Sequence, residues 1–593
     1  MILMDWLWVA MGGIRCPGGS ALLRSSPMDD SDPIPTRQGR VAACFGLMLL
    51  YALQLWSVSQ WLEKDRRPMI TDQSKHFQHA LKTAYFIDHP DLPLRKVVEE
   101  GGESSSGGLR RVLSWLASPV TGYIAWVRGA NVASRYPPLV YFVPAPAVLA
   151  SDGDPDAVRF FTAMVFLAML AWGTYRMGAH FGGPGTGFLS GGLVLALPSV
   201  HDLSVAFLLD LPLMALTACS LASLVAVDGF KNRRASLSFG VWMGIGLLVK
   251  QVLPVFLGGA FLMQAWPAWK SRKMNPVSMR NLFLALAVAI LIGGVFHIPH
   301  SFDSVVHLFY VDHGGTMEGD AGRGDWQGYL VYAIGLVEQA GAVPAVLFGF
   351  ALVPFLIRGA RSARVLLASY FLAYLFFSLL SNKDFRYTAP LLPLVSVVCA
   401  SALTLWLPGK VRAVVGGILL LGLHGLLVAP WMGHEIPTKT HRWKTHLSDG
   451  RTHEFEVRWP LTWSRPQTGN WRLNEIRQAI HDRIEKPEKV RVGVVEPVFE
   501  IVHGLKRLEY RSYLRRRYEK RRELIQLDVD RDVLGGERFV IRIENYRLYD
   551  FYREIYEGNS RRWESMADRY RRIAVFEIPK GQKAEVWERI GSR

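Results

Sequence analysis

Four charged residues of this sequence, three where apolar stretches meet polar segments and one inside an apolar stretch, are of types that suit chemistry on a phosphate. Asp72 follows the apolar stretch 41–62 by about ten residues, so we expect its carboxylate just above a membrane surface. Lys383 and Arg386 stand between two later apolar stretches, and Lys250 lies within another. A carboxylate can accept the proton of an attacking hydroxyl. A guanidinium and an ammonium can stabilise the charge that develops on a phosphate leaving group.

Each of the four also has a structural interpretation. Asp72 could cap the helix that begins beside it, and the basic pair could extend to lipid headgroups. We expect Lys250 near the middle of the bilayer, where an ammonium costs about 2.5–3.5 kcal/mol. It would therefore face an internal cavity or an anionic partner, for which Asp210 is the candidate. A structural pair and a functional pair are equally compatible with the sequence.

The elements that must position these residues are membrane spans. The chain has 593 residues and a net charge of +17, yet its charges concentrate in 432–593, and 41–431 is a succession of long uncharged stretches. An aromatic content of 12% excludes a disordered chain, and four scattered cysteines exclude a disulfide framework. A helix crosses the bilayer with about 20 apolar residues. We predict eleven spans: 41–62, 139–150, 158–178, 186–200, 204–227, 237–265, 281–298, 328–357, 364–381, 387–407 and 411–431.

The distribution of Lys and Arg orients these spans. With the N-terminal segment 1–40 in the cytoplasm, most short-loop basic residues fall inside: Lys270, Arg272, Lys273, Arg280, Arg358, Arg361, Arg364, Lys410 and Arg412. One short loop would then lie outside, with Lys231, Arg233 and Arg234. The C-terminal part also lies outside, because eleven is odd. Met28, which opens a polar lead into the first span, is the expected true start.

Two long loops, 63–138 and 299–327, are predicted on the outer side. The first contains an amphipathic helix at 71–86, with Thr71 or Asp72 as its N-cap. Its apolar face at helical spacing comprises Phe77, Ala80, Leu81 and Ala84. A second, interfacial stretch at 109–127 follows a flexible linker at 99–108. Polar chemistry placed in outer loops favours an enzyme over a channel.

Five short motifs occur in order along the chain: TDQSKHFQHA (71–80), SRYPPLVYF (134–142), LLDLPLMAL (208–216), GIGLLVK (244–250) and DFRYTAPLLPL (384–394). With the eleven spans, they resemble integral-membrane glycosyltransferases of the GT-C fold. The closest resemblance is to the protein O-mannosyltransferase and aminoarabinose-transferase group, which includes the RgtA/B/C/D-like enzymes. It covers about 70–430.

The resemblance implies that a sugar moves from a polyprenyl phosphate to an acceptor on the outer side of the membrane, with inversion. Asp72 would be the catalytic base. Arg386 and Lys383 would bind the donor phosphate, with Lys250 as a weaker candidate. Gln73 and Tyr387 would orient groups by hydrogen bonding.

One departure and one open cofactor question accompany this assignment. The group commonly has Asp-Glu where this chain has Asp72-Gln73, and the acids that could replace the missing carboxylate are Glu99, Glu100 and Glu103. The second outer loop carries a set of metal-ligand types: His297, His300, Asp303, His307, Asp312 and His313. A divalent metal site is one interpretation. We favour solvated interfacial histidines.

Residues 432–593 are predicted to form a soluble domain, a small α/β layer. Strands are expected at 490–499, 538–545 and 571–579, with a helix at 471–486. The basic run 504–524 could bind anionic lipid or an acidic polysaccharide, whereas a solvated helix face balanced by acids is the favoured interpretation. Nucleic acid is not an expected partner, because the domain faces outward.

The predicted fold is thus a polytopic α-helical membrane protein of about eleven spans, GT-C-like, with a C-terminal α/β domain. The predicted function is a glycosyltransferase of the cell membrane that acts on the envelope. Its partners would be a polyprenyl-phosphate-linked sugar, a glycan, lipid or protein acceptor, and membrane lipids. A carrier or flippase for lipid-linked saccharides is the alternative, although no internal repeat supports it. A non-catalytic scaffold for envelope assembly is the third.

Overall fold

The structure is a computed structural model. It describes residues 37–69, 71–89, 136–270, 272–273, 275–298, 325–358, 361–434, 439–446, 452–459, 466–495, 499–519, 521, 524–530, 537–544 and 553–591. The predicted native start at Met28, the linker 99–108 and the stretch 109–127 lie outside these residues. So do the candidate acids Glu99, Glu100 and Glu103, and the outer-loop residues His300, Asp303, His307, Asp312 and His313.

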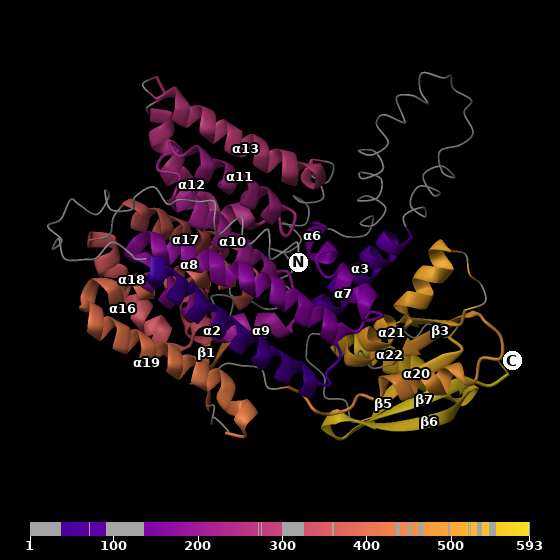
Figure 1. Cartoon of the computed structure of the whole chain (residues 1–593). Coiled ribbons are helices and arrows are strands. Elements are labelled where there is room, and N and C mark those ends of the chain that lie inside the picture. Colours follow the sequence, from indigo (N-terminus) through magenta and orange to yellow (C-terminus); the bar gives the residue numbers. More distant parts are fainter. Residues whose placement is uncertain are drawn as a thin grey trace, which may run out of the picture.

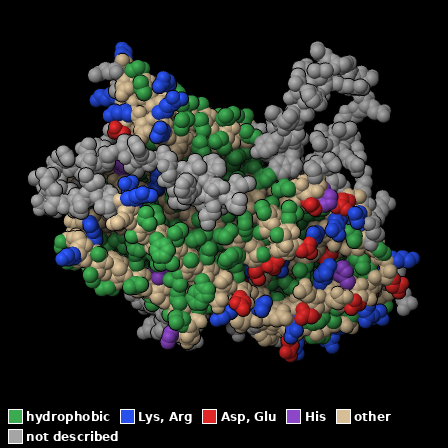
Figure 2. Space-filling model, in the orientation of Figure 1, with side chains coloured by type: hydrophobic (Ala, Val, Ile, Leu, Met, Phe, Trp, Pro, Cys, Tyr) green, Lys and Arg blue, Asp and Glu red, His purple; other side chains and the backbone are tan. Residues whose placement is uncertain are grey.

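A helical bundle forms the first and larger part of the described chain (Figure 1). Its helices are α2 (Arg37–Lys64), α8 (Pro155–Leu195), α9 (Pro198–Val205), α10 (Asp210–Val225), α11 (Arg233–Leu247), α12 (Leu253–Lys270), α13 (Pro276–His297), α15 (Trp326–Ala340), α16 (Ala342–Arg358), α17 (Arg361–Leu379), η1 (Phe385–Leu391), α18 (Leu392–Trp406) and α19 (Gly409–Val428). Large apolar side chains remain exposed on its outer surface, among them Leu291, Phe350 and Leu421. Figure 2 shows a broad hydrophobic face over the bundle, as expected where lipid replaces water.

Six helical segments of the described chain are long and apolar enough to cross a membrane: Arg37–Lys64, Pro155–Leu195, Pro276–His297, Ser362–Leu379, Phe385–Trp406 and Gly409–Met432. Helix α8 is a hairpin rather than one rod, because Gly182 and Gly183 leave the helical conformation. Its arms lie side by side, since a Cβ on Gly187 would stand 2.8 Å from the Tyr175 carbonyl oxygen. The arms match the predicted spans 158–178 and 186–200. The predicted membrane architecture is confirmed, and the number eleven stays a prediction.

Hydrogen bonds between helix ends show that the bundle has two distinct ends. At the end that carries Asp72, hereafter the Asp72 end, α2 finishes and α3 (Thr71–Asp88) begins. The opposite end carries the turns α10–α11 and α12–α13. There the Gln264 amide donates to the Leu224 carbonyl at 3.1 Å, and Asn281 donates to the Phe230 carbonyl at 2.9 Å.

The prediction of one span at 237–265 is wrong, because this segment contains two antiparallel helices. Helix α11 runs from the opposite end to the Asp72 end, and α12 runs back. The break between them holds Lys250, which contacts Asp210 at the start of α10. Lys250 therefore lies at the Asp72 end and not near the middle of the bilayer. At this break between helices, the Lys250 ammonium can reach the Asp210 carboxylate, which compensates its charge.

Because this segment crosses twice, the predicted side of the basic turn before α11 is also wrong. Lys231, Arg233 and Arg234 were expected on the side opposite to Lys270. The Asn281 side chain bonds the backbone of this turn, so the turn lies beside the start of α13. The apparent exception to the charge bias therefore disappears.

The predicted span 139–150 is also wrong. It folds as two short helices, α6 (Leu139–Phe142) and α7 (Ala145–Ala150), separated at Pro144. Both ends of the segment lie at the Asp72 end: the Leu139 amide donates to the Leu248 carbonyl at 3.0 Å, and Asp152 pairs with Arg511 of the C-terminal part. Twelve helical residues would span only about 18 Å, which is too short to cross a bilayer.

Helix α3 follows the amphipathic pattern that the sequence predicts. Phe77, Ala80 and Ala84 are at most 1% exposed and pack with α6 and α7, and Leu81 lies partly buried against them. Thr71 is the first residue of the helix and Asp72 lies within its first turn, so neither is the N-cap. The predicted span 328–357 divides at Gly341, whose φ of +79° ends α15 and lets α16 start in a new direction.

The C-terminal part contains a sheet between two layers of helices. Its strands are β3 (Lys489–Val494), β4 (Gln526–Asp530), β5 (Phe539–Glu544), β6 (Tyr570–Ile578) and β7 (Gln582–Arg589), in the order β4-β3-β5-β7-β6. β3 pairs in parallel with β4 and β5, and β7 pairs antiparallel with β5 and β6. The predicted strands correspond to β3, β5 and β6. The sequence analysis missed β4, β7 and a separate hairpin of β1 (Lys439–His446) and β2 (Thr452–Trp459).

Alternating residues of the sheet separate its two faces. Phe539 and Ile541 face α20 (Leu473–His481) and α21 (Phe499–Tyr518). Val540 faces the other way, where Trp563 of α22 (Arg553–Glu564) covers it. This is a small α/β architecture, as predicted.

The basic helix α21 attaches this domain to the Asp72 end (Figure 1). Leu514 packs with Tyr85 and Phe86 of α3, and Glu519 accepts a hydrogen bond from the Tyr85 hydroxyl. The pairing of its basic residues with acids was the favoured expectation, and Arg511 and Arg521 are paired in this way. Burial of one face of the helix against the membrane bundle was not expected. The domain therefore lies on the same side of the bundle as Asp72.

Candidate active site

Asp72 projects from the first turn of α3 with its side chain about half exposed, at 47%. The Lys75 ammonium is 3.9 Å away and is itself 66% exposed, so this pair is weak and leaves the carboxylate accessible. Gln73 lies beside it, partly buried. A carboxylate held on a helix and open to water can accept a proton from a bound hydroxyl.

Lys250 and Asp210 form the predicted ion pair, with the ammonium 3.0 Å from Oδ1 of the carboxylate. Asp210 is 6% exposed and Lys250 is 20% exposed. The carboxylate is thus enclosed while the lysine side chain is partly exposed. The ring of Tyr387 lies 5.9 Å from the ammonium. The pair brings α10 and the α11–α12 break together at the Asp72 end.

Arg386 is held in one orientation by Asp384. The Arg386 Nε donates to Asp384 Oδ2 at 2.7 Å, and Nη2 donates to the same oxygen. The other oxygen of Asp384 accepts the Arg386 amide at 2.9 Å, so one carboxylate caps η1 and fixes the guanidinium. The charges of Asp210 and Asp72 also act on Arg386. Its side chain stays 38% exposed, which leaves an edge of the guanidinium open to an anion.

Lys383 is placed differently from the other predicted phosphate ligands. Its ammonium is buried at the end of α17 and donates to the carbonyls of Ser378 at 2.6 Å, Leu380 and Phe377. Three donors meeting carbonyls satisfy the free acceptors of a helix C-terminus. The structure thus brings Asp72, Arg386, Lys250 and Tyr387 to one end, while Lys383 points into the fold beside them.

Two residues that the sequence analysis did not assign complete this cluster, His76 and Tyr141. The His76 Nδ1 lies 2.9 Å from the Tyr141 hydroxyl, and both side chains are buried. The ring of Tyr136 meets His76 edge-on at 5.0 Å. Burial, with the charges of His79 and Lys250, lowers the pKa of His76 to about 3, so its ring is neutral at neutral pH. Its position one turn after Asp72 in the first motif was a signal that could have revealed it.

The arrangement offers a proton acceptor and two cations at a membrane boundary. Three or more metal-ligand side chains do not gather anywhere in the described part of the chain. His297, the described member of the predicted set, contacts the Leu247 carbonyl at 2.8 Å. The described residues of this site are therefore suited to bind an anion and to accept a proton.

The chain is similar to known proteins in sequence over one stretch and in fold over most of its length. Residues 113–301 match the family model of dolichyl-phosphate-mannose-protein mannosyltransferase. The matched stretch includes Asp210 and Lys250 but neither Asp72 nor Arg386. No protein of curated function matches the chain significantly in sequence.

Among solved structures, the chain is similar to ArnT from Cupriavidus metallidurans. The apo structure is 13% identical, with 92% of this chain and 98% of that chain covered and a TM-score of 0.52. The structure bound to undecaprenyl phosphate is 12% identical, with 94% and 99% covered and a TM-score of 0.51. The archaeal oligosaccharyltransferase AglB from Archaeoglobus fulgidus is 9% identical, with 93% and 74% covered and a TM-score of 0.48. The likeness to ArnT shows that the chain has the GT-C fold that its motifs predicted, and the family match covers the part of the chain from 113 to 301.

Proposed function

We propose that this protein transfers a sugar from a polyprenyl phosphate to an acceptor hydroxyl at the Asp72 end of the bundle. The observation that carries the proposal is the convergence of an accessible carboxylate, Asp72, with the cations Arg386 and Lys250 at a membrane boundary. ArnT, which shares the fold, has been crystallised with undecaprenyl phosphate. The match to a dolichyl-phosphate-mannose enzyme family supports the same class of donor.

In the proposed reaction, the acceptor oxygen attacks the anomeric carbon of the sugar while the bond from that carbon to the phosphate oxygen breaks. The acceptor proton passes to Asp72, polyprenyl phosphate leaves, and the configuration inverts. Arg386 and Lys250 stabilise the growing charge on the phosphate, where fixed cations lower the barrier most. Asp210 and Asp384 hold these two cations in place.

The remaining predicted residues take supporting roles in the proposal. Tyr387 lies beside Lys250 and limits where its ammonium can move. Gln73 is in the same helical turn as Asp72 and can orient an acceptor group. Lys383 holds the turn before η1, since its donors already meet backbone carbonyls. Its direct binding to phosphate remains a prediction.

We further propose that the Asp72 end and the C-terminal domain face the outside of the cell membrane, with the first described helix starting in the cytoplasm. Support comes from the basic residues at the opposite end. The turns there contain Lys231, Arg233, Arg234, Lys270, Arg272, Lys273 and Arg280. Short cytoplasmic loops carry such an excess. Figure 2 shows Lys and Arg gathered at the tip of the hairpin that α12 and α13 form.

The experiment compares a deletion strain with strains restored by variants, using mass spectrometry of envelope glycans and polyprenyl-phosphate sugars. The deletion is expected to lose one glycan sugar and to accumulate its lipid-linked donor. Asp72→Asn should fail to restore the sugar, because an amide cannot accept the proton. The matched control is Asp228→Asn, an exposed carboxylate in the α10–α11 turn.

Arg386→Ala tests the donor side of the same proposal. It should accumulate the donor as the deletion does, while the protein reaches the membrane in normal amount. Restoration by Asp72→Asn would remove the base assignment. An unchanged glycan profile in the deletion strain would remove the proposed function as a whole.

A further inference from the structure

A cavity lies in the C-terminal domain between α22 and the central strands β3 and β5 of the sheet, away from the candidate active site. Its volume is about 660 Å³, within the range of about 300–1,000 Å³ that small-molecule sites occupy. It is lined by residues of α22, by Val495 after β3 and by Arg542 of β5. Because α22 covers the sheet face opposite to α21, the cavity does not open toward α3.

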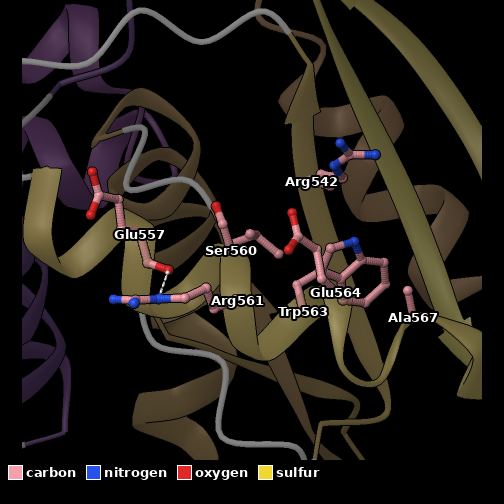
Figure 3. A pocket seen from close by; sticks show the side chains of 8 residues that line it. Arg542, Glu557, Ser560, Arg561, Trp563, Glu564 and Ala567 are labelled. Atoms are coloured by element: carbon pink, nitrogen blue, oxygen red, sulfur yellow. Dashed lines mark hydrogen bonds between the residues drawn. The ribbon is translucent and has the colours of Figure 1, made fainter.

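One face of α22 supplies most of the polar lining. Glu557, Ser560, Arg561 and Glu564 stand at positions i, i+3, i+4 and i+7, so they share one side of the helix. Figure 3 shows these side chains in succession along the helix, with the Trp563 ring beside Glu564.

The floor of the cavity is rigid. Trp563 is 4% exposed and is held between Tyr570, with ring centroids 5.3 Å apart, and Trp587, at 5.5 Å. An indole fixed in this way presents a stable apolar edge to a ligand. The cavity thus has one aromatic element and several side chains that can hydrogen-bond.

Within the described part of the chain, the carboxylates of this helix face are not engaged by other elements of the fold. Glu557 and Arg561 stand at the spacing that favours an ion pair, yet only the Glu557 backbone carbonyl accepts from Arg561 Nε, at 3.2 Å. Among the described residues, the carboxylates of Glu557 and Glu564 and the hydroxyl of Ser560 have no hydrogen-bond or ion-pair partner. Arg542 lies 3.7 Å from the buried carboxylate of Glu585, which positions it but leaves it 42% exposed.

This chemistry selects a class of ligand. Two carboxylates and two guanidiniums cancel in charge, so the cavity does not favour a polyanion such as a phosphate-rich headgroup. A carboxylate can accept two neighbouring hydroxyls, a guanidinium can donate to hydroxyl and ring oxygens, and an aromatic edge can cover an apolar C–H patch. A saccharide carries all three features.

We propose that this cavity binds a short stretch of saccharide. Resting on the proposed function, we assign it to a part of the acceptor glycan that lies distant from the reacting hydroxyl. The cavity lies on the sheet face that points away from α3, so a sugar bound there is far from Asp72. The domain would hold a long acceptor so that its end can reach Asp72.

The test measures saccharide binding directly and does not depend on transfer. The full chain in lipid nanodiscs is screened by saturation-transfer NMR against short neutral, amino and uronic-acid oligosaccharides. We expect one class to bind. Glu557→Gln combined with Glu564→Gln should weaken that binding by about tenfold or more, since charged hydrogen bonds are lost. Ser560→Tyr, which places a ring inside the cavity without altering charge, should also weaken it.

The matched control is Glu485→Gln, which changes an exposed glutamate in the segment after α20, outside the cavity. This variant should bind saccharide as the native protein does. Protease resistance of the domain reports whether each variant is folded. Absence of saccharide binding, equal binding by folded cavity variants, or selective binding of a peptide instead would overturn the proposal.

Asp72→Asn separates the two proposals. It should retain saccharide binding although transfer is lost. If Asp72→Asn is active and the cavity variants fail to bind saccharide, the assignment of Asp72 as the base is wrong. The assignment of the cavity then still holds.

Discussion

At the scale of single residues, the structure turns an isolated acid and scattered cations into a connected set. Asp384 orients Arg386, Asp210 holds Lys250, and Tyr387 lies against Lys250. The residue types at the site were readable from the motifs. The pairings with acids were only partly readable, because they depend on helix ends that are distant in the sequence.

The Lys250–Asp210 pair can be assigned to structure or function by a double-mutant cycle. Lys250→Met should destabilise the fold by about 3–5 kcal/mol, because it leaves the enclosed Asp210 carboxylate without a cation. Lys250→Met with Asp210→Asn should recover most of that stability. Thermal unfolding and titration of polyprenyl phosphate measure both quantities. If the double variant binds polyprenyl phosphate as tightly as the native protein, the pair is purely structural.

The buried histidines of α3 make its packing sensitive to acid. Burial is the main cause that lowers the pKa of His76 to about 3 and of His79 to about 4, from the ordinary value of 6.5. Below pH 6.5 the unfolded state binds protons that the folded state does not, so stability falls as the pH falls. At pH 5 each histidine should cost about 2 kcal/mol, at about 1.4 kcal/mol for one pH unit.

Hydrogen exchange of α3 at pH 7 and pH 5 measures this effect. His76→Gln should reduce the pH dependence, whereas His434→Gln, at an exposed position after α19, should not change it. Equal protection of α3 at the two pH values in the native protein would contradict the argument.

At the scale of elements, the periodicity of apolar residues found α3 but could not divide long apolar stretches. The 3.6-residue pattern of Phe77, Ala80 and Ala84 is local and was sufficient. Within 237–265 the break signals are two glycines, Gly244 and Gly246, then Lys250 and Pro254. They do not place the break by themselves, because it also depends on Asp210 from another helix. β4 and β7 were missed because a strand is defined by its neighbours as much as by its own residues.

Close packing of helices α12 and α17 depends on a glycine. A Cβ on Gly259 would lie 2.1 Å from the Ala368 carbonyl oxygen, a backbone atom that cannot turn aside. Gly259→Ala should therefore destabilise the bundle by about 1–3 kcal/mol. Gly349→Ala, in α16, meets no atom within 4 Å and should be neutral or slightly stabilising. Thermal unfolding in detergent measures both, and equal melting temperatures would contradict the packing argument.

At the scale of the whole molecule, two of the three errors in the predicted spans cancel. The third, the division of 328–357 at Gly341, adds no crossing, because α15 stays beside η1 and the turn before it. There Tyr332 and Gln339 hydrogen-bond to Asn382 and Thr388. One expected crossing, at 139–150, does not occur, and the segment 237–265 crosses twice instead of once. The number of crossings before the C-terminal domain thus keeps its parity. The domain was predicted on the side of Asp72 for this reason, and α21 lies against α3 on that side. Only the turn that holds Lys231 changes sides of the membrane relative to the prediction.

That turn gives a direct test of orientation. Lys231 is exposed at the opposite end of the bundle, and Ser565 is exposed in the C-terminal domain. Each is replaced by cysteine in a chain from which the native cysteines have been removed. A membrane-impermeant thiol reagent on intact cells should label Ser565→Cys and leave Lys231→Cys unlabelled until the membrane is opened. The eleven spans of the sequence analysis place both residues outside, so that arrangement would label both at once. Labelling of Lys231→Cys alone would instead invert the protein and put Asp72 in the cytoplasm, where the proposed outward-facing transfer could not occur.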